Sequence, residues 1–157
     1  GELTKILATA DGLYQSRNWL AAERAYLRVL KLDHGNLLAF RRLALVYTYL
    51  KNYADAAECI EIVLKSDQTA ADLQNYATIL HHSKRLPEAI EAMQRSLTLQ
   101  PSVDRAISLA RLCGEAGDRS RQYEALRAAI EIAPNNQDVR HMLAAWQGAR
   151  QSPKIEK

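Results

Sequence analysis

The chain has 157 residues, of which 48% are hydrophobic and 25% are charged, a balance typical of a single folded domain rather than of a disordered chain. Lys and Arg number 21 and Asp and Glu 18, so the net charge of +3 excludes the dense positive field of a dedicated nucleic-acid-binding protein. Gly (6) and Pro (4) are scarce, which excludes collagen and low-complexity chains and disfavours a turn-rich β-sandwich. The composition therefore favours an all-α protein.

Apolar residues recur at i, i+4, i+7 and i+8 along most of the chain, a pattern typical of amphipathic helices. In one stretch Ala56, Ile60, Val63 and Leu64 share a single helical face. Short polar breaks such as Lys51-Asn52 supply turn or capping residues between such stretches. In chain order the pattern predicts helices over residues 4–16, 19–32, 37–50, 53–66, 70–83, 86–99, 103–116 and 119–133.

Residues 137–149 predict a ninth helix. Its apolar residues fall on one helical face: Val139, Met142, Leu143 and Trp146. The last member of a helical stack needs a cover with a polar outer side, so we expect this helix to cap the preceding pair. Residues 151–157 are interpreted as a polar tail.

The second helix of each predicted pair repeats the same sequence pattern. Residues 18–30 align with residues 52–64, 85–97 and 118–130, at offsets of 34, 33 and 33. A fixed period of this length indicates a solenoid of stacked helix pairs. The predicted organisation is one domain over residues 3–150, with units over about 3–36, 37–69, 70–102 and 103–136.

These repeated residues resemble the tetratricopeptide repeat, a helix-turn-helix unit of about 34 residues. The resemblance covers about residues 3–136 and rests on two small-residue sites, one large apolar site and a closing proline: Ala10, Ala44, Ala77 and Ala110; Ala22, Ala56 and Ala89; Tyr26, Ile60, Met93 and Leu126; Pro101 and Pro134. The sequence departs from the family at Gln122, where a small residue is usual, and at His34 and Gln68, which replace proline. No unit carries the tryptophan of the family's opening motif. The resemblance implies an all-α, right-handed superhelical solenoid of about nine antiparallel helices.

In that family the first helices of the units line a concave groove, and side chains off the packing face contact a bound peptide or protein segment. The resemblance implies the groove residues Leu7, Tyr14, Arg41, Leu45, Tyr49, Gln74, His81 and Arg111, with Ile107 beside them. Apolar and tyrosine side chains gather in the amino-terminal half, where a partner is expected to anchor its large side chains. Arg41 is expected to donate to a carbonyl or carboxylate of the partner. The alternative is that tight curvature buries Leu38 and Leu45.

No arrangement of residues predicts catalysis, a cofactor or a metal site. His81 and His82 are adjacent, so they point about 100° apart on a helix and cannot chelate as an i, i+4 pair does. Cys59 and Cys113 lie on or beside apolar helix faces and are interpreted as inert packing residues. No Gly-rich phosphate loop and no recognisable nucleophile–base motif is present. The expectation is a protein that is not an enzyme.

The sequence therefore predicts a non-catalytic interaction module that binds a peptide or protein segment in its groove. Two alternatives stay open, namely a self-associating oligomeric scaffold and a small secretion-type chaperone for an apolar client. No nucleic-acid partner is expected, and no run approaches the roughly 20 apolar residues of a membrane-spanning helix. Localisation stays open: the cytoplasm is the expectation, and a signal or anchor upstream of Gly1 would change it.

Overall fold

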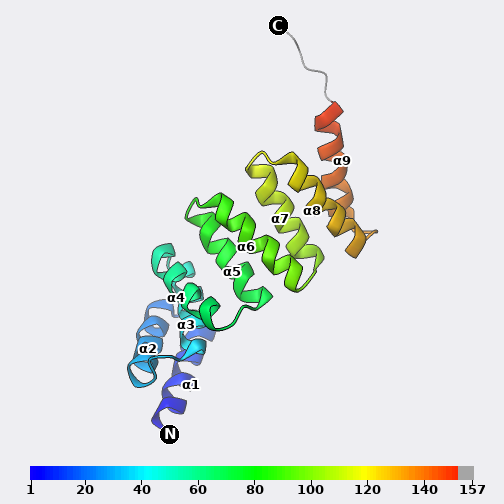
Figure 1. Ribbon diagram of the computed structural model, residues 1–157. Coiled ribbons are helices and arrows are strands. Elements are labelled where there is room, and N and C mark those ends of the chain that lie inside the picture. Colours follow the sequence, from blue (N-terminus) through cyan, green and yellow to red (C-terminus); the bar gives the residue numbers. More distant parts are fainter. Residues whose placement is uncertain (152–157) are drawn as a thin grey trace.

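The computed structural model describes residues 1–151 and shows a stack of helices (Figure 1). Over these residues the chain forms nine α-helices and no strand, which confirms the predicted all-α class. Their bounds are α1 (Glu2–Gln15), α2 (Trp19–Leu32), α3 (Leu37–Tyr49), α4 (Tyr53–Ser66), α5 (Ala70–His82), α6 (Leu86–Leu99), α7 (Val103–Glu115), α8 (Arg119–Ile132) and α9 (Gln137–Gln151). The predicted bounds hold to within two residues. Of the predicted tail, residue 151 closes α9, and residues 152–157 lie outside the described residues.

The helices pair in chain order and stack along one direction, with α9 at the far end (Figure 1). Each helix packs mainly against the helices before and after it in the chain, as in other repeat solenoids. We refer to the pairs α1–α2, α3–α4, α5–α6 and α7–α8 as units 1 to 4. Buried side chains form two clusters, one over α1 to α5 and one over α5 to α9, and Tyr76 of α5 packs against both. The two cores therefore meet at α5.

The turn inside each unit has the same backbone conformation. One residue per turn has a φ in the left-handed region: Arg17, Lys51, Lys84 and Gly117. In three units the next residue caps the second helix, because its side chain accepts from a backbone N–H three residues on: Asn18, Asn52 and Asp118. In unit 3 Arg85 makes no such bond, and Pro87 occupies the first turn instead, where its missing N–H costs nothing. A repeated turn gives the four units the same internal geometry.

The small residues of the repeat lie buried between packed helices. All seven are fully buried: Ala10, Ala22, Ala44, Ala56, Ala77, Ala89 and Ala110. Helix axes approach to about 8 Å only where no large side chain intervenes. The large apolar residues of the repeat, for example Tyr26 and Ile60, are also buried in the core. The period in the sequence therefore identifies the packing positions correctly.

Replacing Ala89 by Leu is expected to destabilise the protein by about 1–3 kcal/mol. The added carbons enter a contact with no exposed surface, so the neighbouring helices must shift or adopt poor rotamers. Thermal unfolding followed by circular dichroism measures the change. An unchanged melting temperature would show that the site has room for the larger side chain.

The departure at Gln122 is explained by Gly114 on the facing helix. A Cβ at Gly114 would lie 2.8 Å from Nε2 of Gln122, which is closer than real Cβ atoms come. In units 1 to 3 the position of Gly114 holds Tyr14, Thr48 and His81. In unit 4 the small residue has thus moved from the second helix to the first, and α7 and α8 still pack closely.

The two ends of the stack are covered differently. In α3, Leu43 and Val46 are buried. The equivalent positions of α1 hold Thr9 and Gly12, which are exposed. Unit 1 therefore presents a polar side that needs no cover. At the other end α9 packs on α8 and buries Val139 completely. Thus α9 lies where the sequence predicts a cap.

Candidate functional site

The predicted groove residues all lie on the first helices of the units, α1, α3, α5 and α7. We call the side of the stack formed by these helices the first-helix face, and the side formed by α2, α4, α6 and α8 the second-helix face. The structure places the predicted residues in four different surroundings. Only some of them are available to a partner.

An aromatic cluster joins units 1 and 2, in which Tyr14 of α1 and Tyr49 of α3 both contact Trp19 at the start of α2. The ring of Tyr49 stacks on Trp19, with 4.2 Å between the centroids and 2° between the planes, and Tyr14 and Trp19 form a T-shaped pair with 5.5 Å between their centroids. The guanidinium of Arg42 lies 4.9 Å from the centroid of Tyr14. Tyr49 nevertheless remains 57% exposed. The ring of Trp19 is partly buried and joins Tyr14 to Tyr49, a contact that the helical pattern of the sequence does not predict.

The leucines of the predicted groove are only partly available. Leu7 is half-buried and packs against the first core cluster. Leu45 is also half-buried, whereas Leu38 is exposed. Ile107, which the resemblance assigned to the groove, is buried in the second core cluster. That assignment is wrong, because the side chain packs into the core instead of facing outward.

Arg41 is paired with a carboxylate of the chain itself. Its Nε lies 2.9 and 3.0 Å from the two carboxylate oxygens of Asp72, and its second terminal nitrogen lies 2.8 Å from Oδ2. The Thr69 hydroxyl donates to the same carboxylate at 2.8 Å, and Asp72 is only 2% exposed. The hydrogen bonds to Asp72 raise the pKa of Arg41. Arg41 therefore joins α3 to α5, and the guanidinium expected to reach a partner already has a carboxylate.

Sequence reasoning missed Asp72, although one signal was present. Thr69 and Asp72 stand three residues apart at the start of a helix, the spacing of a capping box. The Thr69 side chain accepts from the backbone N–H of Asp72, as that spacing predicts. What the spacing does not give is the second partner, Arg41, one unit earlier.

His81 and Arg111 meet at a pocket between α5 and α7, which we call the α5–α7 pocket. Its volume is about 270 Å³, and it is lined by Ala77, Thr78, His81, Met93, Ser108, Arg111, Leu112 and Glu115. The Nε2 of His81 lies 2.7 Å from a carboxylate oxygen of Glu115. Arg111 is exposed and has no ion-pair partner among residues 1–151. Gln74 is half-buried on the same helix as His81, outside the pocket lining.

His82, Cys59 and Cys113 are stacked or buried. His82 stacks on Tyr53 at 5.0 Å, and in the described part of the chain no group of three or more His, Cys, Asp or Glu is placed to hold a metal ion. Cys59 and Cys113 are buried. Burial raises the pKa of Cys59 to about 12 and raises that of Cys113, so both thiols stay protonated at neutral pH.

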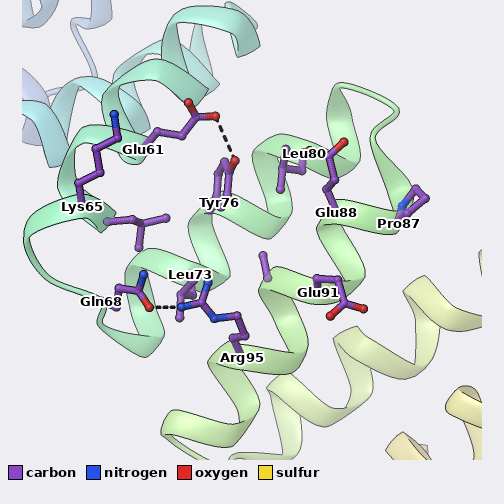
Figure 2. A pocket seen from close by; sticks show the side chains of 12 residues that line it. Glu61, Lys65, Gln68, Leu73, Tyr76, Leu80, Pro87, Glu88, Glu91 and Arg95 are labelled. Atoms are coloured by element: carbon purple, nitrogen blue, oxygen red, sulfur yellow. Dashed lines mark hydrogen bonds between the residues drawn. The ribbon is translucent and has the colours of Figure 1, made fainter.

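A larger hollow, which sequence reasoning missed, lies on the second-helix face between α4 and α6 (Figure 2). We call it the α4–α6 groove. Its volume is about 590 Å³, and it is lined by Glu61, Leu64, Lys65, Gln68, Leu73, Tyr76, Leu80, Pro87, Glu88, Glu91, Ala92 and Arg95. Residues of α5 line its base between α4 and α6. The Tyr76 hydroxyl of α5 donates to Glu61 of α4 at 3.0 Å.

Within residues 1–151, none of the helices is long and apolar enough to cross a membrane.

Solved structures with the same fold include MamA and YrrB. A MamA structure superposes with a TM-score of 0.85 at 21% sequence identity, over 94% of this chain and 82% of that one. YrrB, described as a TPR protein with an unusual peptide-binding site, gives 0.80 at 16% identity, over 95% and 78%. MamA from Desulfovibrio magneticus RS-1, from residue 41 to its end, gives 0.79 at 20% identity, over 86% and 77%. At these identities the likeness shows the fold alone.

The sequence itself identifies the family. No curated protein matches the chain significantly. The family model described as Tetratricopeptide repeat matches residues 7–71 and, overlapping them, 41–104. These matches span more than half of the chain, and the helix pairs repeat with the family's period. The chain therefore belongs to the tetratricopeptide repeat family.

Proposed function

We propose that the chain is a non-catalytic interaction module that binds a protein segment along its first-helix face, the concave groove of the family. The single observation that carries this proposal is Tyr49, a large aromatic side chain that is 57% exposed and yet held rigid by its stack on Trp19. An aromatic ring fixed in this way loses little conformational entropy when a partner covers it. Tyrosine is also among the residues that most often dominate binding energy.

The α5–α7 pocket provides a second, chemically different contact on the same face. Ala77, Met93 and Leu112 give it an apolar lining, and Arg111 stands at its edge without a carboxylate partner in the described chain. Arginine binds carboxylates bidentately. A segment with an apolar side chain at Tyr49 and a carboxylate at Arg111 is the ligand that these surroundings fit.

Membership of the family supports the same conclusion at a coarser level. Tetratricopeptide repeat proteins are generally interaction modules without catalysis, and YrrB is described as having a peptide-binding site. Fold alone does not name a ligand, so the proposal depends on Tyr49 and Arg111 rather than on the likeness. Leu7, Tyr14, Leu45, Gln74 and His81 complete the proposed surface, and Arg41 supports it from within.

Tyr49→Ala is expected to weaken partner binding by about 1–3 kcal/mol, the range for an interfacial aromatic hot spot. Partners captured from native lysate by the wild type would be identified by mass spectrometry. Affinities of the captured protein would then be measured for each variant, with Arg111→Glu as the second test of the same face.

The matched control is Tyr123→Ala. Tyr123 stacks on Trp146 at 4.7 Å and lies on α8, on the second-helix face, so its removal also deletes an aromatic stack. Equal losses of affinity for Tyr49→Ala and Tyr123→Ala would contradict the proposal, because they would trace to stability rather than to the first-helix face.

Self-association remains a second candidate because α2 exposes large apolar side chains. Leu20, Leu27 and Leu32 all lie exposed on this helix, where a second copy would cover them. Sedimentation at increasing protein concentration tests this, with Leu20→Lys and Leu27→Lys expected to lower the association constant. The chaperone alternative stays a prediction, tested by co-purification of an unfolded apolar client.

A further inference from the structure

The turns inside the units form one edge of the stack, which we call the turn edge. It consists of residues 16–18, 50–52, 83–85 and 116–118, and Figure 1 shows the turns of units 3 and 4 on the same side of the stack. In units 1 to 3 the turn residue with a left-handed φ is a cation: Arg17, Lys51 and Lys84. All three are exposed, and in the described chain none of them has a carboxylate partner. The turn edge therefore repeats one unpaired positive charge per unit.

Two exposed aromatic rings lie between these charges. Tyr49 ends α3 and His82 ends α5, so they occupy the same repeat position, and both are exposed. Tyr49 stacks on Trp19 of the unit before it. His82 stacks in the same way on Tyr53, with 5.0 Å between the centroids and 3° between the planes. Charges and exposed rings therefore alternate along the turn edge, in the order Arg17, Tyr49, Lys51, His82 and Lys84.

The carboxylates near the turn edge do not pair with these cations. In unit 1 no Asp or Glu lies within four residues of the turn. In units 2 to 4 the carboxylates next to the turns already have other partners: Asp55 with Asn52, Glu88 with Arg85, Glu115 with His81, and Asp118 with the backbone N–H of Arg121. The three cations are therefore available to a carboxylate from outside the chain.

Unit 4 shows that the turn itself does not need a cation. Its left-handed residue is Gly117, with a φ of 74°, and glycine adopts this conformation at the lowest cost. The equivalent residues of units 1 to 3 have φ values of 60° and 61°, which are less favourable for a residue with a Cβ. The geometry of the turn thus gives no reason for Lys or Arg at this position, whereas a binding role does. Unit 4 also carries Glu115 in place of the ring, so the row ends at Lys84.

The spacing of the row suits an extended chain. Packed helices lie about 8–10 Å apart, so equivalent side chains of successive units are separated by roughly 10 Å. An extended segment advances about 3.3 Å per residue, so about every third residue meets the next charge. Single exposed ion pairs contribute little, but a segment on this edge makes several in register and also stacks on two rings. Repetition therefore supplies the binding energy that one pair lacks.

We propose that the turn edge binds an extended acidic segment of a partner protein. Carboxylates of the segment pair with Arg17, Lys51 and Lys84, and aromatic side chains between them cover Tyr49 and His82. This inference rests on the proposed function, because Tyr49 belongs to both surfaces. It adds the chemistry of the partner and continues the binding surface from the first-helix face onto the turn edge.

A protein segment fits the turn edge better than a single-stranded nucleic acid does. Bases also stack on exposed rings, but nucleic-acid binding relies on a dense positive field, and the chain has a net charge of only +3. A nucleic acid carries a phosphate at every nucleotide, so most of its charges would meet no cation in this row. A protein segment places carboxylates only where the cations lie.

The probe is a fluorescently labelled designed peptide with Glu at every third residue and Phe and Gly residues between. Fluorescence anisotropy is measured at about 0.15 M salt, where charges more than about 8 Å apart are largely screened. Saturable binding to the wild type is expected. A second peptide, with Lys in place of each Glu, should bind the wild type much more weakly.

The turn variant is Arg17→Glu with Lys51→Glu and Lys84→Glu, and it should lower the affinity for the designed peptide at least tenfold. The Lys peptide should bind this variant more tightly than it binds the wild type. Circular dichroism must show that the variant keeps the helical content and melting temperature of the wild type. Should it fail to fold, Arg17→Gln with Lys51→Gln and Lys84→Gln removes the charges without reversing them and should lower the affinity in the same direction.

The matched control reverses one Arg and two Lys at the opposite ends of α2 and α4. Arg28→Glu with Lys31→Glu and Lys65→Glu gives the same net charge as the turn variant, and all three residues are exposed. At this salt concentration the control should bind the designed peptide within about twofold of the wild type. A loss confined to the turn variant therefore reports contact with the turn edge rather than overall charge.

His82 separates this inference from the proposed function, because it belongs to the turn edge alone. His82→Ala should weaken the designed peptide by roughly two- to tenfold, as expected for one aromatic contact, and Arg111→Glu should leave it unchanged. A captured partner that loses affinity in Tyr49→Ala and Arg111→Glu, but not in the turn variant, would refute this inference and leave the proposed function intact.

Three further outcomes would overturn the inference. One is the absence of saturable binding of the designed peptide to the wild type. Another is an equal loss of affinity in the turn variant and its matched control, which would show a response to net charge alone. The third is tighter binding of a labelled oligothymidylate than of the designed peptide, abolished in the turn variant, which would make a nucleic acid the occupant.

Discussion

Replacing Arg41 by Met is expected to lower the free energy of unfolding by about 3 kcal/mol, and the melting temperature by about 10 °C. The Asp72 carboxylate would remain 2% exposed and lose the guanidinium that now holds both of its oxygens. Thr69 alone would then satisfy a buried charge. Removing one partner of a buried ion pair is costly because the other charge is left uncompensated.

Asp72→Asn should lower the free energy of unfolding less than Arg41→Met does. In Asp72→Asn the guanidinium of Arg41, whose side chain is 32% exposed, can reach water and the carboxylate of Asp67, which is now 3.9 Å away. A loss of about 1–2 kcal/mol is expected, close to that of a hydrogen bond to a charged group. The double variant Arg41→Met with Asp72→Asn should therefore be more stable than Arg41→Met alone. Chemical denaturation of all four proteins gives the coupling energy.

The adjacent Arg42 provides the matched control. Its guanidinium lies 4.0 Å from Asp11, a carboxylate whose side chain is 42% exposed, and pairs of this kind contribute at most about 1 kcal/mol. Arg42→Met should therefore cost clearly less than Arg41→Met. Equal losses of stability for Arg41→Met and Arg42→Met would mean that the Arg41–Asp72 pair stabilises the protein no more than an exposed pair does.

The position of this pair gives the experiment a second readout. Arg41 lies on α3, which contributes to the first core cluster, and Asp72 lies in the first turn of α5, where the two clusters meet. In a solenoid, stability is approximately a sum of unit and interface terms. Weakening this interface should separate the unfolding of units 1 and 2 from that of units 3 and 4, seen as a broader or biphasic melting curve.

How much the sequence could predict depends on the range of the interaction. The period of 34, 33 and 33 residues fixed the buried alanines, because every unit repeats the same local contact. Helical phase also placed His81 and Arg111 on one face, and the structure brings both to the α5–α7 pocket. These features follow either from a contact that every unit repeats or from helical phase within one helix.

Features that depend on a particular partner were not predictable in this way. Arg41 has the right helical phase for the groove, but Asp72, 31 residues later, already binds it. Ile107 has the same phase and is buried. The α4–α6 groove lies between the second helices of two different units, and hydrophobic periodicity within one unit does not predict it.

Removing residues 137–157 is expected to have the other large effect, lowering the free energy of unfolding by about 3–5 kcal/mol. Complete burial of Val139 accounts for about 1.5–3 kcal/mol of that, and the stack of Tyr123 on Trp146 adds about 0.5–1.5 kcal/mol. Without α9, the outward side of Leu126 and Ile130 meets water. The shortened chain should therefore melt earlier and also associate, as expected of an uncapped stack.

A single substitution separates loss of the cap from loss of chain length. Val139→Asp should act in the same direction as the truncation, because it places a charge in the contact between α8 and α9. His141→Asp adds the same charge on the exposed side of α9 and should leave stability within about 0.5 kcal/mol of the wild type. Thermal melting and sedimentation velocity measure both effects. A truncated chain that remains monomeric and as stable as the wild type would mean that unit 4 is stable with its outward side exposed, and α9 would then have no capping role.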